Sequence, residues 1–176
     1  MPTPIEQNHA AVEERIRAAC ERAGRDRDDV LLIAVSKYRP LEQTAELHSL
    51  GIRDFGENRV QEGRDKIPQL PEDIAWHLIG PLQSNKAKYL PGLFSWVHSV
   101  ERIKTANALE KAYAKHDEKL NILVQFNIAG EEQKSGADPE EADALIKHIL
   151  DDCPHLDIRG LMCMAPYYDD PQDTRP

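Results

Sequence analysis

The sequence predicts an α/β protein in which parallel strands alternate with helices. Three observations indicate this fold class. Residues 30–35 form an unbroken apolar run, which is typical of a strand covered on both faces of a parallel sheet. A strand-then-helix alternation follows and repeats along the chain. The length of 176 residues suits one domain with a sizeable core.

The first helix is expected between Thr3 and Gly24. Thr3 is a capping residue, Pro4 suits the first helical position, and Glu6 stands where its side chain can reach back to the backbone of the cap. Apolar residues then recur at helical spacing. Gly24 can adopt the left-handed conformation that ends a last turn.

After the apolar strand, the same patterns predict ten further elements. Strands are expected near residues 52–55, 75–79, 95–98, 121–128 and 157–164. Helices are expected near residues 41–50, 59–67, 84–89, 101–115 and 138–153. In the last of these, Asp138 and Pro139 provide the same capping chemistry as the first helix, and Pro154 stops the helix.

Such alternation fits either a doubly wound open sheet or a (β/α) barrel. Neither GxGxxG nor GxxxxGK[ST] occurs, so the two commonest phosphate loops of open sheets are absent, and this favours the barrel. A complete barrel has eight strands and typically ~250 residues. We therefore expect residues 1–176 to form a single barrel domain with about six βα units, lacking the C-terminal two.

Composition excludes several classes of function. The formal net charge is -9 and no Lys/Arg-rich run occurs, so nucleic acid and anionic membranes are not expected partners. The N-terminus lacks the layout of a signal peptide, and no segment is long enough to span a membrane. Three widely spaced cysteines indicate reduced thiols in a cytoplasmic protein. The seven histidines lack zinc-ligand spacing, so no metal site is expected.

Polar residues stand where the predicted strands end, and active sites of barrels lie at the carboxyl ends of the strands. Lys37 follows the first apolar run. A lysine in a partly desolvated barrel mouth offers a neutral amine for attack on an aldehyde, which is Schiff-base chemistry. On position alone, a solvated strand-end lysine is the commoner case, because lysines are almost never fully buried.

Other strand-end residues have two interpretations each. Asn58 suits a ligand contact, and equally a tight turn with a helix cap. His77 suits a pocket, and equally a hydrogen-bonded core position beside Trp76. Ser99 also stands where it could cap the helix expected near Glu101.

Three blocks of sequence carry a resemblance to a known family. They are Ala34-Val35-Ser36-Lys37, the block FGENRVQE at 55–62 and the block WHLIGPLQSNK at 76–86. Shorter stretches extend the match at 98–100, 125–128, 134–136 and 160–162. Together they closely resemble the pyridoxal 5'-phosphate (PLP) homeostasis proteins, which are one-domain relatives of alanine racemase. The resemblance implies a (β/α)8 TIM barrel of the PLP fold-type III kind.

By this resemblance Lys37 would hold PLP as a Schiff base, and Asn58 would contact the cofactor. Met162 would lie near the PLP ring, where a flexible thioether packs against an aromatic face, and His77 and Ser99 are further pocket candidates. The implied function is PLP homeostasis, in which a monomeric carrier or buffer holds the reactive aldehyde and supplies PLP-dependent apoenzymes, without established catalysis.

Two enzyme interpretations stay open at this point. A PLP-dependent amino-acid racemase would use Lys37 on one face of the substrate and a second acid or base on the other. A Schiff-base aldolase would need acid-base residues beside the lysine, for which Glu57 and His77 are available. The family's serine-rich phosphate cup and the arginine facing the pyridine nitrogen have no counterpart up to Pro176, so we expect them beyond it.

Overall fold

The computed structural model describes residues 1–128, 136–166 and 168–174, so Lys134 and Ser135 of the resembling stretch 134–136 lie outside the described residues. One parallel sheet has six strands in the order β1-β2-β3-β4-β5-β6. The strands are β1 Ala34–Val35, β2 Asp54–Glu57, β3 Ala75–Leu78, β4 Trp96–Val100, β5 Leu120–Phe126 and β6 Leu156–Cys163. Each strand therefore pairs with the next one along the chain, as successive βα units require.

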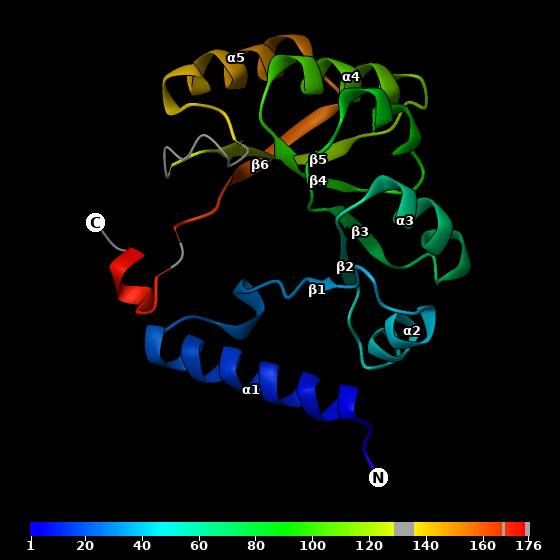
Figure 1. Ribbon diagram of the computed structural model, residues 1–176, viewed down its shortest axis with the longest axis vertical. Coiled ribbons are helices and arrows are strands. Elements are labelled where there is room, and N and C mark those ends of the chain that lie inside the picture. Colours follow the sequence, from blue (N-terminus) through cyan, green and yellow to red (C-terminus); the bar gives the residue numbers. More distant parts are fainter. Residues whose placement is uncertain (129–135, 167, 175–176) are drawn as a thin grey trace.

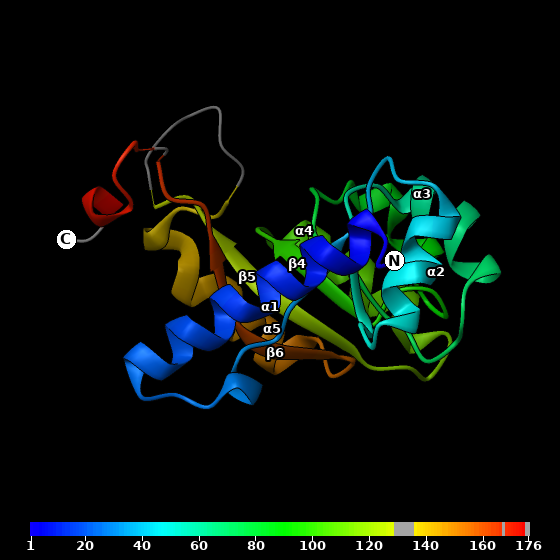
Figure 2. The same cartoon turned by 90° about the horizontal axis from the view of Figure 1, so that it is seen from below.

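Figure 1 shows the strands following one another in an arc, with helices on its outer side. The α-helices are α1 Pro4–Ala23, α2 Leu41–Ser49, α3 Val60–Lys66, α4 Ile103–Ala114 and α5 Ala142–Asp152. Short 3-10 helices are η1 Arg27–Asp29, η2 Ile67–Gln69, η3 Ser84–Tyr89, η4 Pro139–Glu141 and η5 Pro171–Thr174. Figure 2 shows the same arc from below, with α1 crossing beneath it.

The hydrophobic core lies between the sheet and the outer helices. Alternate strand residues such as Phe55, Leu78 and Ile122 are fully buried, and α4 and α5 contribute Leu109 and Ile149. Because strand side chains alternate between two faces, this packing turns the other residues of each strand towards the inside of the arc. The carboxyl ends of the strands therefore combine a rigid core on one face with a second face available for a site.

The predicted start and end of the first helix are confirmed. Thr3 and Glu6 form a capping box, and Gly24 closes the helix in the left-handed conformation with φ 63°. Asp138 accepts a hydrogen bond from the Glu140 N–H at 2.9 Å, as expected for a cap. It caps η4, however, and the α-helix proper begins at Ala142.

The strand expected at 30–35 is wrong in length and in burial. Only Ala34–Val35 is strand, and the exposed fractions of Leu31 and Val35 are 58% and 49%. The reason is that β1 lies at an edge of the sheet, where within the described residues it pairs only with β2. An apolar run forms a strand that is buried on both faces only where other parts of the fold cover both faces.

The helix expected at 84–89 is a 3-10 helix rather than an α-helix. The Lys86 N–H donates to the Gln83 carbonyl and the Leu90 N–H donates to the Ala87 carbonyl, which are i to i+3 bonds. Such tight turns suit short connections between strands.

None of the three cysteines is in a disulfide; Cys20 and Cys153 are buried and Cys163 is exposed. Within the described part of the chain, none of the helices combines the length and the apolar character needed to cross a membrane. Among the same residues, no cluster of three His, Cys, Asp or Glu side chains is arranged to hold a metal ion.

Candidate functional site

Lys37 and Asn58 lie next to each other at the carboxyl ends of β1 and β2. Val35 pairs with Gly56 in the sheet register, and the Ser36 N–H donates to the Gly56 carbonyl at 3.0 Å. Lys37 and Asn58 therefore follow the ends of two paired strands, Lys37 two residues after β1 ends and Asn58 directly after β2. Both side chains are half-buried, and within the described residues neither makes a hydrogen bond or ion pair. Among the described residues, an amine and an amide without hydrogen-bond partners therefore lie at the ends of two neighbouring strands.

A buried polar cluster beneath this point holds the backbone of Lys37. Lys66 of α3 donates from Nζ to the Ser36 carbonyl at 2.7 Å and to Glu57 Oε1 at 2.5 Å. Ser36 donates from Oγ to the same carboxylate oxygen at 2.7 Å. The Arg39 N–H donates to the Ser36 carbonyl at 3.1 Å, so residues 36–39 form a tight turn that contains Lys37. The sequence did not predict this cluster, because lysine is rarely buried.

Asn58 is held by a close approach of the next loop. A Cβ on Gly80 would lie 2.2 Å from the Asn58 carbonyl oxygen, so only glycine fits there. Ser99 is buried and donates from Oγ to the Gly80 carbonyl at 2.7 Å. The interpretation of Ser99 as a helix cap is wrong, because α4 begins after Arg102 and has no side-chain cap. Ser99 instead fixes the loop that packs against Asn58.

His77 lies in a hydrogen-bonded chain on the strands. Its exposed fraction is 1%, its Nε2 lies 2.9 Å from Asp54 Oδ1, and its Nδ1 lies 2.9 Å from His98 Nε2. Burial lowers the pKa of His77, and burial together with the neighbouring His77 lowers the pKa of His98 to about 4. A carboxylate can only accept, so His77 Nε2 donates to Asp54, and the lowered pKa of His77 favours the neutral ring, whose Nδ1 accepts from His98 Nε2. His77 also stacks on Trp96 at 5.3 Å, whereas Trp76 packs on Phe55.

Met162 is half-buried on β6, opposite Gln125 of β5. Because β6 and β1 are the two outer strands of the sheet, the sheet does not bring Met162 and Lys37 together as neighbours. Of the residues predicted for the site, the fold thus pairs Lys37 with Asn58, links Ser99 to Asn58 through Gly80, and leaves His77 and Met162 on other strands.

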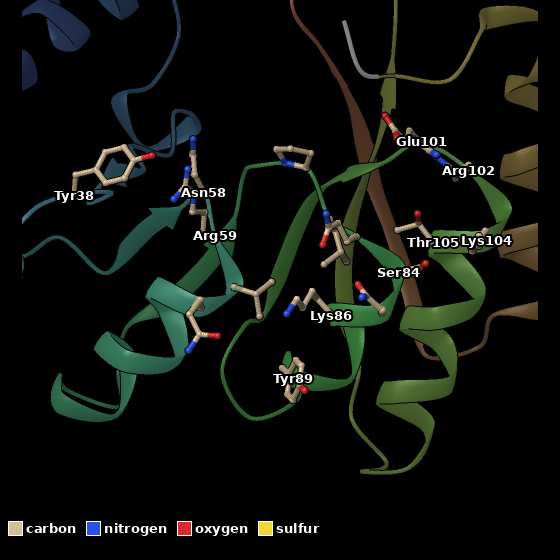
Figure 3. A pocket seen from close by; sticks show the side chains of 16 residues that line it. Tyr38, Asn58, Arg59, Ser84, Lys86, Tyr89, Glu101, Arg102, Lys104 and Thr105 are labelled. Carbon is tan, nitrogen blue, oxygen red and sulfur yellow. Dashed lines mark hydrogen bonds and ion pairs between the residues drawn. The ribbon is translucent and has the colours of Figure 1, made fainter. Parts of the chain in front are cut away.

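A pocket of about 850 Å³ opens beside Asn58, where the segments that follow β2, β3 and β4 meet (Figure 3). Asn58 and Tyr38, the residue after Lys37, line the pocket. Lys37 itself does not line the pocket. Basic side chains are frequent in the lining, which comprises residues 38, 58–61, 81–86, 89, 101, 102, 104 and 105. Sequence reasoning missed this pocket, since Arg102 and Lys104 stand outside the resembling blocks.

Comparison with known proteins identifies the family. The pyridoxal phosphate homeostasis protein of Pseudomonas aeruginosa is 44% identical over 161 residues, covering 91% of this chain and 70% of the relative. That of Aquifex aeolicus is 40% identical over 166 residues, covering 94% of this chain and 72% of the relative. This chain belongs to the pyridoxal phosphate homeostasis protein family. The family model "Alanine racemase, N-terminal domain" also matches residues 7–176.

Solved structures confirm the fold expected for a PLP homeostasis protein. A protein from Bifidobacterium adolescentis matches with a TM-score of 0.87 and 30% identity, covering 94% of this chain and 71% of that one. PipY of Synechococcus elongatus, solved with PLP bound, matches with a TM-score of 0.72 and 36% identity, covering 86% and 70%. Alanine racemase from Corynebacterium glutamicum, at 18% identity and a TM-score of 0.65, covers 94% and 46% and shows the barrel fold alone.

Proposed function

We propose that this chain binds PLP at the carboxyl ends of β1 and β2, with Lys37 as the covalently bonded residue, and that it serves PLP homeostasis. The observation that carries the proposal is that Lys37 and Asn58, neither with a side-chain partner among the described residues, follow the ends of the paired strands β1 and β2. This pair stands in a chain whose relatives are named for pyridoxal phosphate homeostasis and whose structural neighbour PipY was solved with PLP.

The residues present fit such a cofactor. PLP supplies an aldehyde, with which an unprotonated lysine amine condenses. Among the described residues, no carboxylate pairs with the Lys37 amine, and the Lys37 backbone is anchored through Ser36. The amide of Asn58 offers both a donor and an acceptor to polar substituents of the ring. The two side chains therefore supply a covalent anchor and an orienting contact.

The other candidates take different roles in this proposal. Met162 is half-buried on β6 and provides a polarizable thioether for packing against the PLP ring. Ser99 acts as a positioning residue through Gly80 and Asn58. His77 acts as a positioning residue through its bonds to Asp54 and His98, which tie β2, β3 and β4 together.

We further propose that residues 1–176 form one domain that contains six of the eight βα units of the barrel. The chain covers 70% and 72% of the length of the two bacterial relatives above. Two more units would cover the free edges of β1 and β6, which a soluble protein must pair or protect. We place the phosphate contacts on those units. We also propose that the protein is a monomeric, cytoplasmic carrier that supplies PLP to PLP-dependent apoenzymes.

A borohydride trapping experiment tests the covalent site. The full chain is mixed with PLP, the near-visible absorbance is recorded, and the adduct is reduced and mapped by peptide mass spectrometry. We expect the label on Lys37, and loss of both the band and the label in Lys37→Ala. The control Lys88→Ala, an exposed lysine of η3 away from the site, should keep both. A label that persists at full occupancy in Lys37→Ala would contradict the assignment.

Two functional assays separate a carrier from an enzyme. The PLP-loaded chain should restore activity to a PLP-dependent apoenzyme at a rate that depends on Lys37. Incubation with a panel of L-amino acids should leave their configuration unchanged. Steady racemisation abolished by Lys37→Ala would favour the racemase instead, for which the 18% identity to alanine racemase gives only the fold.

A further inference from the structure

The pocket beside Asn58 has a charge opposite to that of the whole chain. Arg59, Lys86, Arg102 and Lys104 line it, and among the described lining residues Glu101 is the only carboxylate. The chain as a whole carries a formal net charge of -9. A local excess of cations in an acidic protein creates a positive potential in a concave site, where field lines are focused.

Two of the four cations have no carboxylate partner in the part of the chain that the structure describes. Within the described residues, Lys86 and Lys104 form no ion pair. Arg59 lies 4.0 Å from Glu62 with its side chain 67% exposed, which is a weak contact. Only Arg102 makes a close pair, with Glu101. Among the described residues, the four cations of the pocket therefore outnumber the two carboxylates that pair with them.

The neutral lining suits the same kind of ligand. Amide side chains come from Gln61, Gln83 and Asn85, and hydroxyl groups come from Ser84 and Thr105. These groups donate hydrogen bonds in addition to the guanidinium and ammonium donors. A volume of about 850 Å³ lies in the range of small-molecule sites, which are roughly 300–1,000 Å³.

An aromatic wall completes the pocket. The ring of Tyr89 lies 4.5 Å from the Arg64 guanidinium carbon and 5.9 Å from Lys86 Nζ, measured to the ring centroid. Figure 3 shows Tyr89 and Lys86 on one side of the pocket, with Arg102 and Lys104 on another and Arg59 on a third. The cations therefore come from three different segments of the chain and surround one space.

We propose that this pocket binds a small molecule carrying a phosphate or diphosphate group, at a site separate from Lys37. Arginine and lysine side chains bind phosphate oxygens through charge-assisted hydrogen bonds, which are roughly twice as strong as neutral ones. The proposal goes beyond PLP binding, because Lys37 does not line the pocket. It also gives a role to residues 59–61 and 81–86, which belong to the resembling blocks but have no part in the proposed covalent site.

Calorimetric titration with sodium pyrophosphate tests the proposal. The full chain is titrated at low ionic strength, once without PLP and once after borohydride has fixed PLP on Lys37. We expect saturable binding in both samples and a steep loss of affinity with added salt. Lys86→Gln and Lys104→Gln should each weaken binding about tenfold, the size of one charge-assisted contact. Lys37→Ala should leave the affinity unchanged, so a failed covalent site and a failed pocket are told apart.

Lys88→Gln provides the matched control. Lys88 belongs to the same 3-10 helix as Lys86 and also lies near the Tyr89 ring, at 5.0 Å, but it does not line the pocket. Its removal should change the affinity by less than about twofold. Absence of saturable binding, or equal losses in Lys86→Gln and Lys88→Gln, would overturn the proposal. Tighter binding of a hexaglutamate peptide than of pyrophosphate would overturn it in favour of an acidic protein segment.

Discussion

Replacement of Lys66 by methionine removes the charge that balances Glu57 beneath the Lys37 site. The side chains of Lys66 and Glu57 are 10% and 0% exposed, and Lys66 Nζ lies 2.5 Å from Glu57 Oε1. Methionine has nearly the same length and fills the same space without an ammonium group. The variant therefore tests the charge with little change in packing.

The expected loss in the free energy of unfolding follows from the hydrogen bonds that Glu57 would retain in the variant. Its Oε1 would retain one hydrogen bond from Ser36 Oγ, and its Oε2 has no hydrogen-bond partner. The Ser36 carbonyl would also lose its bond from Lys66 Nζ at 2.7 Å. Breaking a buried ion pair by removing one partner costs about 3–5 kcal/mol. Because domains are stable by only about 5–15 kcal/mol, Lys66→Met should lose a large part of the free energy of unfolding.

Urea unfolding at pH 7, followed by tryptophan fluorescence, measures this loss. Glu57→Gln in the Lys66→Met background removes the unpaired charge and should recover about 2 kcal/mol. Lys88→Met, at an exposed position of η3, should change the free energy of unfolding by less than about 0.5 kcal/mol. A double variant no more stable than Lys66→Met would refute the reasoning, since the cost would then not come from an unpaired carboxylate.

Three further predictions concern the surroundings of the site. The pKa of His98 is about 4 in the folded chain, below its ordinary value of 6.5, mainly because of burial. The unfolded chain therefore binds the proton first, and the free energy of unfolding falls as the pH drops from 6.5 towards 4. After allowance for solvent screening of this half-buried ring, His98→Gln should make this decrease in the free energy of unfolding smaller by about 1–2 kcal/mol, measured by urea titrations. An unchanged dependence of the free energy of unfolding on pH would contradict the prediction. In Gly80→Ala the new Cβ would lie 2.2 Å from the Asn58 carbonyl oxygen. The variant should lose about 1–3 kcal/mol of the free energy of unfolding, measured by thermal unfolding, and should bind PLP more weakly. Unchanged stability together with unchanged PLP binding would contradict this prediction. Tyr113→Phe leaves the Phe94 carbonyl without its buried donor at 2.6 Å and should cost about 1–3 kcal/mol in chemical unfolding, more than an exposed Tyr38→Phe.

Local sequence patterns predicted the parts of the fold that depend on local physics. The capping box at Thr3 and the left-handed Gly24 bound the first helix as expected, because both act through bonds within one turn. The alternation of elements likewise predicted six parallel strands in chain order. The burial of residues 30–35 was wrong, since it depends on whether the sheet continues beyond β1, and no local pattern contains that information.

The candidate site was likewise predicted only in part from the sequence. Lys37 and Asn58 stand at strand ends, so topology and resemblance together pointed to them. The charge on Lys66 had no such signal, because its burial depends on an acceptor nine residues away and a carbonyl thirty residues away. Arg102 and Lys104 join the phosphate-binding candidates only because the loop after β4 lies beside the loops after β2 and β3. Contacts between distant segments of this kind need the structure.

The polar cluster also explains how two nearby lysines come to differ in chemistry. The ammonium group of Lys66 donates hydrogen bonds to a buried carboxylate and a buried carbonyl. Its amine is therefore unavailable to an aldehyde. Through Ser36, the same bonds hold the backbone of Lys37, whose side chain makes no hydrogen bond or ion pair with the part of the chain that the structure describes. In the proposed site, Lys66 would therefore provide rigidity and Lys37 the reactive amine. PLP should accordingly be trapped on Lys37 and not on Lys66, and a borohydride label on Lys66 in the folded protein would show that the cluster does not protect its amine.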